Sequence, residues 1–428
     1  MDVRLSYGER GLTVRVPDDR LAGVLAPPDA PPVANLDEAV RASLSQPIGT
    51  WPLADLASES QDACIVVCDA TRPVPTRSIL PLVLAALDDG GMPRERVTVL
   101  IATGTHRPAT WTEMLHIVGE DLAPHLRVVN HVGDDPVTHV DVGRTERGTR
   151  VLLDATYCEA DLKITLGLIE PHFMAGYSGG RKMVMPGVAA LETVLAWHSP
   201  AFLEHPRSAS GVIEGNPVHE EATAAARLCP PDFTIDVTLD ASNAVTGVFA
   251  GGFDAAWRAG VAFADAHCRA RAPEPADIVV TTCAGYPLDA TFYQAVKGMV
   301  GALPVVKPGG DLIIAAECRE GVGSDAFRDM LLGWEDLERF VAAIQEPGWT
   351  PTRDQWEVEE LATAVRHCNV TCVAEGIPSE LLGRLHVTPA ETVEAALARA
   401  LDRRGPSARV LLMPRGPYVI AEAAETAG

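Results

Sequence analysis

The sequence has no long apolar run and no Cys-x-x-Cys pair, and it is short of positive charge. No stretch approaches the roughly 18 to 20 apolar residues that a membrane-spanning helix needs. The first ten residues, MDVRLSYGER, contain no apolar signal segment. The nine cysteines are scattered, and an odd count without framework spacing favours free thiols. We therefore expect a cytoplasmic protein with reduced cysteines and no contact with a membrane.

The shortage of basic residues also argues against nucleic acid as a partner. The chain has 35 Lys and Arg against 58 Asp and Glu, a formal net charge of -23 at pH 7. Such a field does not attract polyanions, so basic residues that cluster locally stand out. What the chain does have is apolar surface to bury: 47% of its 428 residues are hydrophobic, which suits a globular protein of two or three domains.

The order of apolar and polar residues predicts two α/β domains with mostly parallel sheets. An alternating segment at residues 3–19 is typical of a β-hairpin. From about residue 62, short apolar runs alternate with amphipathic stretches, which is the pattern of βα units. Prolines after a helical pattern place a boundary near Arg271. We expect an N-terminal domain at residues 1–271, a C-terminal domain at residues 272–428, and an active site in the crevice between them.

Three predicted strands of the first domain end in polar motifs, CDATRPVP, TGTHRP and IEPHFMAGYSGGRK. Ligands of open α/β sheets bind at the carboxyl ends of strands, so these ends should converge on one crevice. His106 and His172 would then face each other, and two imidazoles can exchange protons on either side of a substrate. The pair indicates an isomerase acting at one carbon. Taken singly, Asp69 also suits a turn cap, and His172 a packed, hydrogen-bonded histidine.

The loop GYSGGRKMVMPG, residues 176–187, combines glycines with two adjacent cations. Glycine N–H groups with Arg181 and Lys182 would suit a phosphate cradle. The loop is not a Walker A motif, because Arg181 and Met183 stand where that motif needs Gly and Ser or Thr. Lys182 has two interpretations that the spacing leaves open: a lysine that pairs with phosphate, or an amine nucleophile for covalent attachment of a cofactor.

Further candidates lie outside these motifs. His198 ends a predicted helix over VAALETVLAWHS and suits either a core histidine or a metal ligand. In the second domain, Tyr293, Gln294 and Lys297 share one side of a predicted helix, as a carboxylate-binding arm or as a solvated face. Trp356 suits core packing or a lid over a planar ring.

Together these motifs resemble those of the nickel-pincer lactate racemase family. DATRP, TGTHRP, EPHFMAGYSGGRK, WHS and GYPLD…YQAVKGM occur in the same order over nearly the whole chain. The resemblance implies a nickel-pincer nucleotide, a pyridinium-3-thioamide-5-thiocarboxylic acid mononucleotide that holds nickel, joined to Lys182 and made by separate maturation enzymes. It implies His198 as the nickel ligand and His106 and His172 as the acid/base pair. It also implies further cofactor contacts from Asp69, Ala70, Thr71, Arg72 and Trp356.

The activity implied by the resemblance is racemisation or epimerisation of a 2-hydroxy acid, such as lactate, by hydride transfer to and from the cofactor. Arg72, Tyr293, Gln294 and Lys297 would hold the substrate. Family members often have His where this chain has Ala70, so no polar side-chain contact is expected there. The alternative is a non-catalytic protein that binds a nucleotide phosphate in the loop from Gly176 to Gly187.

Overall fold

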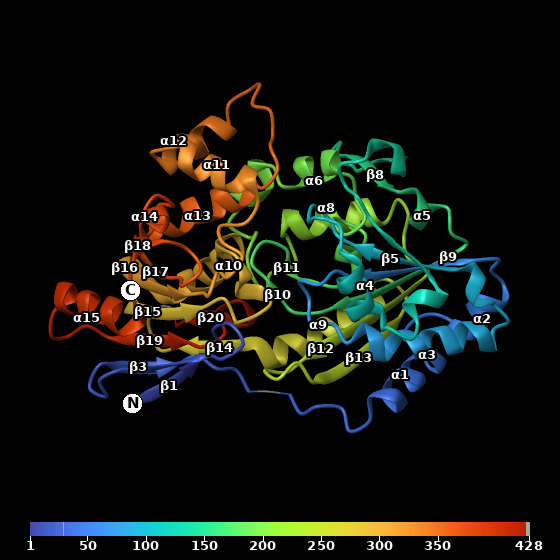
Figure 1. The fold of residues 1–428 in the computed structure, drawn as a ribbon, viewed down its shortest axis with the longest axis horizontal. Coiled ribbons are helices and arrows are strands. Elements are labelled where there is room, and N and C mark those ends of the chain that lie inside the picture. Colours follow the sequence, from blue (N-terminus) through green and yellow to red (C-terminus); the bar gives the residue numbers. More distant parts are fainter. Residues whose placement is uncertain (29, 425–428) are drawn as a thin grey trace. The chain divides into compact units, whose positions relative to one another are not determined.

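The computed structural model describes residues 1–28 and 30–424, and its contacts divide the chain into two compact units (Figure 1). One unit comprises Asp29–His267, and the other comprises Met1–Pro28 together with Cys268–Gly428. Each unit contains a six-stranded sheet with helices. The predicted fold class, two α/β domains with mostly parallel sheets, is confirmed.

The sheet of the first unit has the strand order β13-β12-β9-β4-β5-β6. All neighbours pair in parallel except β13, which is antiparallel to β12 at the edge. The strands are β4 (Ala63–Cys68), β5 (Val97–Ala102), β6 (Arg127–Asn130), β9 (Leu162–Leu168), β12 (Phe233–Leu239) and β13 (Val245–Gly251). Every residue of β4 is buried, which is why its sequence, ACIVVC, is apolar throughout instead of alternating.

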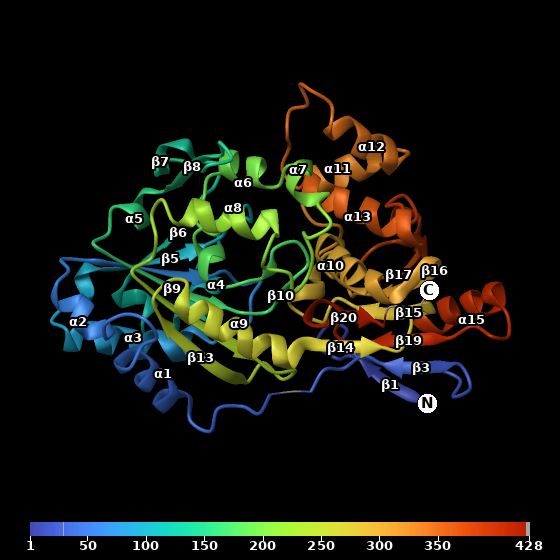
Figure 2. The same cartoon turned by 180° about the vertical axis from the view of Figure 1, so that it is seen from behind.

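Helices cover this sheet on both faces. They are α1 (Leu36–Ser45), α2 (Leu53–Ser58), α3 (Thr76–Asp89), α4 (Trp111–Val118), α5 (Ala155–Cys158), α6 (Leu191–Trp197), α7 (Pro200–Leu203), α8 (Pro217–Ala226) and α9 (Ala255–Cys268). Apolar residues of α1, α2 and α3 form one core with the sheet. Figure 2 shows α8 on the side of the sheet opposite to α1 and α3. Two small ribbons complete the unit, β7 (His139–Arg144) with β8 (Arg150–Asp154), and β10 (Pro171–His172) with β11 (Gly176–Tyr177).

The strand order explains where a site forms. The chain passes from β4 to β5 and β6 on one side, and it later returns to β9 on the other side of β4. The carboxyl ends of β4 and β9 therefore flank a topological switch point, where open α/β sheets bind ligands. The three polar motifs follow β4, β5 and β9, which are neighbours in the sheet, as predicted.

The sheet of the second unit has the order β18-β17-β16-β15-β19-β3 and is parallel throughout. Its strands are β3 (Leu21–Val24), β15 (Ala276–Thr282), β16 (Val306–Ala315), β17 (Asn369–Val373), β18 (Thr388–Pro389) and β19 (Val410–Met413). Its helices are α10 (Phe292–Ala302), α11 (Asp325–Gly333), α12 (Leu337–Ile344), α13 (Gln355–His367), α14 (Ser379–Leu382) and α15 (Val393–Arg404).

The N-terminal segment belongs to the second unit, whereas the sequence assigned it to the first. The predicted hairpin is present, as β1 (Asp2–Leu5) and β2 (Leu12–Arg15). Its apolar side packs in a core with residues of β15 and β19, and β3 pairs with β19. The expected boundary at Arg271 falls inside β14 (Arg269–Ala272), which pairs with β20 (Ile420–Ala423). A short alternating segment does not specify which sheet it joins, because its pattern records only that one side is buried.

No helix within residues 1–28 and 30–424 is both long and apolar enough to cross a bilayer. The nine cysteines all carry free thiols, as the sequence predicts.

Candidate active site

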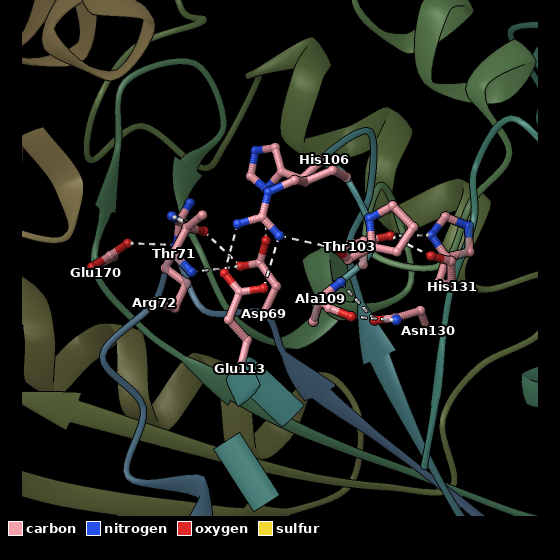
Figure 3. Close-up of polar contacts among 12 residues, drawn as sticks. Asp69, Thr71, Arg72, Thr103, His106, Ala109, Glu113, Asn130, His131 and Glu170 are labelled. Carbon is pink, nitrogen blue, oxygen red and sulfur yellow. Dashed lines mark hydrogen bonds and ion pairs between the residues drawn. The ribbon is translucent and has the colours of Figure 1, made fainter. Parts of the chain in front are cut away.

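Asp69 and His106 form a carboxylate–imidazole pair beyond the ends of β4 and β5 (Figure 3). His106 Nδ1 lies 2.7 Å from Asp69 Oδ2, while Asp69 Oδ1 accepts from the backbone N (3.2 Å) and Oγ1 (2.6 Å) of Thr71. Burial raises the pKa of Asp69, but His106, Thr71 and Arg72 together outweigh burial and hold that pKa below its usual value. Because an ionised Asp69 only accepts, the Nδ1 atom of His106 carries the proton, and Nε2 is the lone-pair nitrogen.

Arg72 is paired with an acid that sequence reasoning missed. Its Nε lies 3.2 Å from Glu170 Oε1, with side chains 20% and 13% exposed. Glu170 follows the end of β9. Its backbone N–H donates to Ser178 Oγ at 3.0 Å, which restrains the backbone at this position. The only sequence signal was an acid two residues before His172 in the motif EPH. Glu170 holds the guanidinium in place and offsets part of its charge.

His172 has the opposite tautomer to His106. Its Nδ1 accepts hydrogen bonds from the backbone N of Met174 (3.3 Å) and of Ala175 (3.1 Å). A ring nitrogen that accepts two N–H donors carries no proton of its own, so the proton of the neutral ring is on Nε2. The two predicted acid/base histidines therefore differ: His106 has its lone pair at Nε2, and His172 has its N–H there.

Two glycines in the left-handed backbone conformation direct the chain of the glycine loop toward Lys182. Gly179 and Gly180 have φ of +72° and +50°, and a Cβ at Gly179 would lie 2.7 Å from Asp236 Oδ1. Arg181 does not face outward as a phosphate ligand would. Its guanidinium is buried 3.9 Å from the Trp257 ring, and its Nη2 donates to the carbonyls of Ala175 and Tyr177. Arg181 thus fixes the loop, which weakens the phosphate-cradle interpretation.

Lys182 and His198 contact the same aromatic ring. Lys182 Nζ lies 4.7 Å from the centroid of Trp197, and the Trp197 and His198 rings are 4.3 Å apart. Trp197 is fully buried at the end of α6, and sequence reasoning did not single it out. The glycine loop and the end of α6 therefore lie next to each other, although Lys182 and His198 are 16 positions apart in the sequence.

His198 is held as a neutral imidazole. Its Nδ1 donates to Val194 O at 3.1 Å, which leaves Nε2 as the lone-pair nitrogen. Burial, with the charge of Lys182, lowers the pKa of His198 well below its usual value. A metal binds the neutral imidazole, so this state favours metal binding. No group of three or more His, Cys, Asp or Glu side chains in the described residues could hold a metal. A metal at His198 would need its other ligands from a bound molecule.

The candidates of the second unit lie together on α10 and α13. Trp356, buried, donates from Nε1 to Tyr293 Oη at 2.8 Å. Among the described residues, Gln294 Oε1 is buried without a hydrogen-bond partner. Burial raises the pKa of Glu357 to about 8, although the charge of Lys297 opposes the rise. Sequence reasoning missed Glu357, because one acid among several in RDQWEVEE carries no sign of burial.

Ala70 lies between Asp69 and Thr71 and packs against the apolar core of the first unit. Its methyl group has no hydrogen-bonding atom, so the cofactor contact predicted at Ala70 stays a prediction and would involve the backbone.

Profiles of known families match both parts of the chain. The lactate racemase N-terminal domain matches residues 7–211, and the lactate racemase C-terminal domain matches residues 272–421. The chain belongs to the lactate racemase family. The predicted membership is confirmed, and it places the protein among the isomerases.

Curated relatives and solved structures of lactate racemases agree with this assignment. The lactate racemase of Lactiplantibacillus plantarum is 36% identical over 423 residues, covering 98% of this chain and 99% of that protein. The lactate racemase of Thermoanaerobacterium thermosaccharolyticum is 35% identical over 422 residues, with the same coverage. The structure of the apoprotein from that organism superposes with a TM-score of 0.92 at 34% identity, over 98% of this chain and 100% of that one. A Thermotoga maritima structure, with a TM-score of 0.71 and 16% identity over 93% of this chain, shares the fold alone.

Proposed function

We propose that this lactate racemase family member interconverts the enantiomers of a 2-hydroxy acid, with lactate as the first candidate, using a nickel-pincer nucleotide attached through Lys182. The observation that carries the proposal is the contact of Lys182 and His198 with one ring, Trp197. An amine for covalent attachment and a neutral imidazole for a metal then lie at one place. Lactate is the substrate in the names of both curated relatives.

The residues fit this cofactor. A covalent link needs a lysine amine, and Lys182 lies in a loop that Arg181 holds in place. Nickel needs a neutral imidazole, which His198 supplies through its Nε2. One histidine without further metal-binding groups among the described residues suits a metal whose other donors belong to the cofactor. When bound, the group supplies a site that accepts hydride from the substrate carbon and returns it.

The histidines are proposed to transfer the protons and to bind the substrate oxygen. In the proposed reaction, His106 Nε2 takes the proton of the substrate hydroxyl, and the Asp69 carboxylate stabilises the imidazolium that results. His172 Nε2–H donates a hydrogen bond to the substrate oxygen. As hydride leaves Cα, the substrate becomes a planar 2-keto acid. When hydride returns to the other face and the His106 imidazolium returns the proton to the oxygen, the opposite enantiomer forms.

Arg72 is proposed to bind the substrate carboxylate. A guanidinium offers several donors in a fixed plane, and the Glu170 contact fixes the orientation of that plane. Tyr293, Gln294, Lys297 and Trp356 are proposed as further substrate and cofactor contacts from the second unit. The hydrogen bond from Trp356 to Tyr293 supports a shared role, because it fixes both side chains.

The direct test is a chiral assay of the loaded enzyme. The protein is produced together with the cofactor-maturation enzymes, and each single enantiomer of lactate, malate and larger aliphatic and aromatic 2-hydroxy acids is incubated with it. We expect either enantiomer of one acid to reach the same mixture, measured by chiral chromatography. Protein that carries nickel and the lysine adduct but inverts none of these acids would contradict the proposed function.

His198→Ala should lower the nickel content of the purified holoprotein by about tenfold or more, because the side chain that would bind the metal is gone. Nickel is measured by inductively coupled plasma mass spectrometry, and intact mass shows whether the adduct is still present. His205→Ala, in the loop beyond α7, is the matched control and should keep its nickel. Full nickel occupancy in the His198 variant would rule out this ligand.

A further inference from the structure

His131 and His139 form an imidazole pair beside the loop that carries His106, and the proposed reaction does not use them. His131 follows β6 and is fully buried, and His139 begins β7. Their Nε2 atoms lie 3.0 Å apart, and the two rings are at 89° to each other. Figure 3 shows His131 against Thr103, the residue after β5.

The outer contacts of the pair determine where the ring protons are. His139 Nδ1 lies 2.8 Å from the carbonyl of Asp135, which only accepts, so this nitrogen carries a proton. The Thr103 hydroxyl donates its single proton to the carbonyl of His131 at 2.7 Å. The 3.1 Å contact between Thr103 Oγ1 and His131 Nδ1 therefore requires the proton on His131 Nδ1.

Two neutral rings do not satisfy this arrangement. A neutral imidazole has one N–H, and both would be on Nδ1, so two Nε2 lone pairs would face each other at 3.0 Å. Such a contact is stable only with a cation between the two atoms. The described residues offer no third metal-binding group, which favours a proton. Burial, with His139 nearby, lowers the pKa of His131 to about 3, which favours His131 Nε2 as the acceptor of that proton and His139 Nε2 as its donor.

We propose that His131 and His139 hold one proton more than two neutral imidazoles, and that this proton sets the hydrogen bonds of Thr103. When the proton is lost, the neutral pair is satisfied only if His131 Nε2 becomes the donor to His139. His131 Nδ1 then becomes an acceptor and takes the Thr103 hydroxyl proton. The 2.7 Å contact between Thr103 and the His131 carbonyl loses its hydrogen and has to lengthen.

Thr103 connects the pair to the candidate active site. Its carbonyl accepts from His106 N at 2.9 Å, within the same loop. The next residue, Gly104, donates from N to Gly187 O at 3.0 Å, at the end of the loop that contains Lys182. The pair touches neither substrate nor cofactor in this scheme. The pair is a positioning element: a change in its protonation alters the hydrogen bonds of Thr103 and, through Thr103, the position of His106.

Acidic side chains near the two histidines offset the positive charge of the additional proton. Asp154 of β8 is opposite His139 in the β7–β8 register; burial raises the pKa of Asp154, and His139 opposes the rise. Asp134 and Asp135 lie in the segment between the two histidines, and Asp135 Oδ1 accepts from Val137 N. On β7 the nearest charged side chain, that of Asp141, is paired with Arg150 of β8. The segments after β5 and after Gly187 contribute the uncharged Thr103 and the Ala189 carbonyl.

The test is nitrogen NMR of apoprotein labelled with ¹⁵N-histidine between pH 5 and 9, and it needs no cofactor. At the acidic end we expect protons on both nitrogens of His139 and on Nδ1 of His131. As the pH rises, His139 loses one proton, and over the same range the proton of His131 moves from Nδ1 to Nε2. A change of tautomer in His131, without any change in the number of its protons, would identify the shared proton.

Two variants make the outcome decisive. His131→Asn and His139→Gln assign the signals, and the glutamine amide of the second variant donates to His131 Nε2 at every pH. His131 should then keep its proton on Nδ1 throughout, and the ring signals of His106 should lose the additional shift that follows the pair in the wild type. A neutral His139, or a His131 with one tautomer at all pH values in the wild type, would overturn the shared proton. A His106 unaffected by the pair would overturn its positioning role, and neither result bears on racemisation.

Discussion

We expect Lys182→Arg to lose the proposed covalent cofactor and its racemase activity to fall on the order of 10³-fold or more. The substitution keeps a cation next to Trp197, where Lys182 Nζ lies 4.7 Å from the ring centroid. A guanidinium remains protonated and is a poor nucleophile, so it does not form the amide-type link. Without the link, the reacting group is no longer held by the protein, and the advantage of a fixed geometry is lost.

Intact-mass spectrometry of protein made with the maturation enzymes measures this result. The wild type should carry an adduct that peptide mapping places on Lys182, and the arginine variant should have the mass of the bare chain. Lys163→Arg is the matched control. Lys163 donates from Nζ to Ala160 O at 2.8 Å at the opposite end of β9, and its replacement should leave the adduct and the activity in place. An adduct on the Lys182 variant would show that the anchor is elsewhere.

Much of the fold was predictable because local patterns specify it. The buried run of β4 and the amphipathic pattern of α3 each determine an element without reference to the rest of the chain. The convergence of the TGTHRP and EPHF motifs follows from a general property of parallel sheets, whose carboxyl ends share an edge. The attachment of β1, β2 and β3 to the second unit was not predictable, since it depends on a sheet formed more than 250 residues later.

The residues that sequence reasoning missed share one property: each contacts at least one residue that is distant in the chain. Glu170 matters because Arg72 is next to it, and Trp197 because Lys182 and His198 both reach its ring. Periodicity shows that a residue is buried but does not show what it touches. The same limit applies to tautomers. The sequence suggests two equivalent histidines, while the Asp69 carboxylate at one and two backbone N–H groups at the other make them different.

Asp69→Asn should lower kcat almost as far as His106→Gln, which removes the base and is expected to cost about 10²- to 10⁴-fold. The amide presents an N–H where the carboxylate accepted the His106 Nδ1 proton at 2.7 Å. If that N–H faces Nδ1, the ring proton moves to Nε2, and His106 has no lone pair for the substrate hydroxyl. If the amide oxygen faces Nδ1 instead, the imidazolium loses the charge that stabilises it.

Thr71→Val is the control that distinguishes loss of the proton control by Asp69 from a general disturbance of the site. Thr71 Oγ1 bonds the other oxygen of Asp69 at 2.6 Å, so its removal disturbs the same carboxylate but leaves the His106 contact. We expect that variant to lose about tenfold or less, in line with one hydrogen bond to a charged group, about 1.5 kcal/mol. Turnover is measured with single enantiomers on protein matched for nickel and adduct content. If the Asp69 and Thr71 variants were equally active, Asp69 would not control the proton on His106.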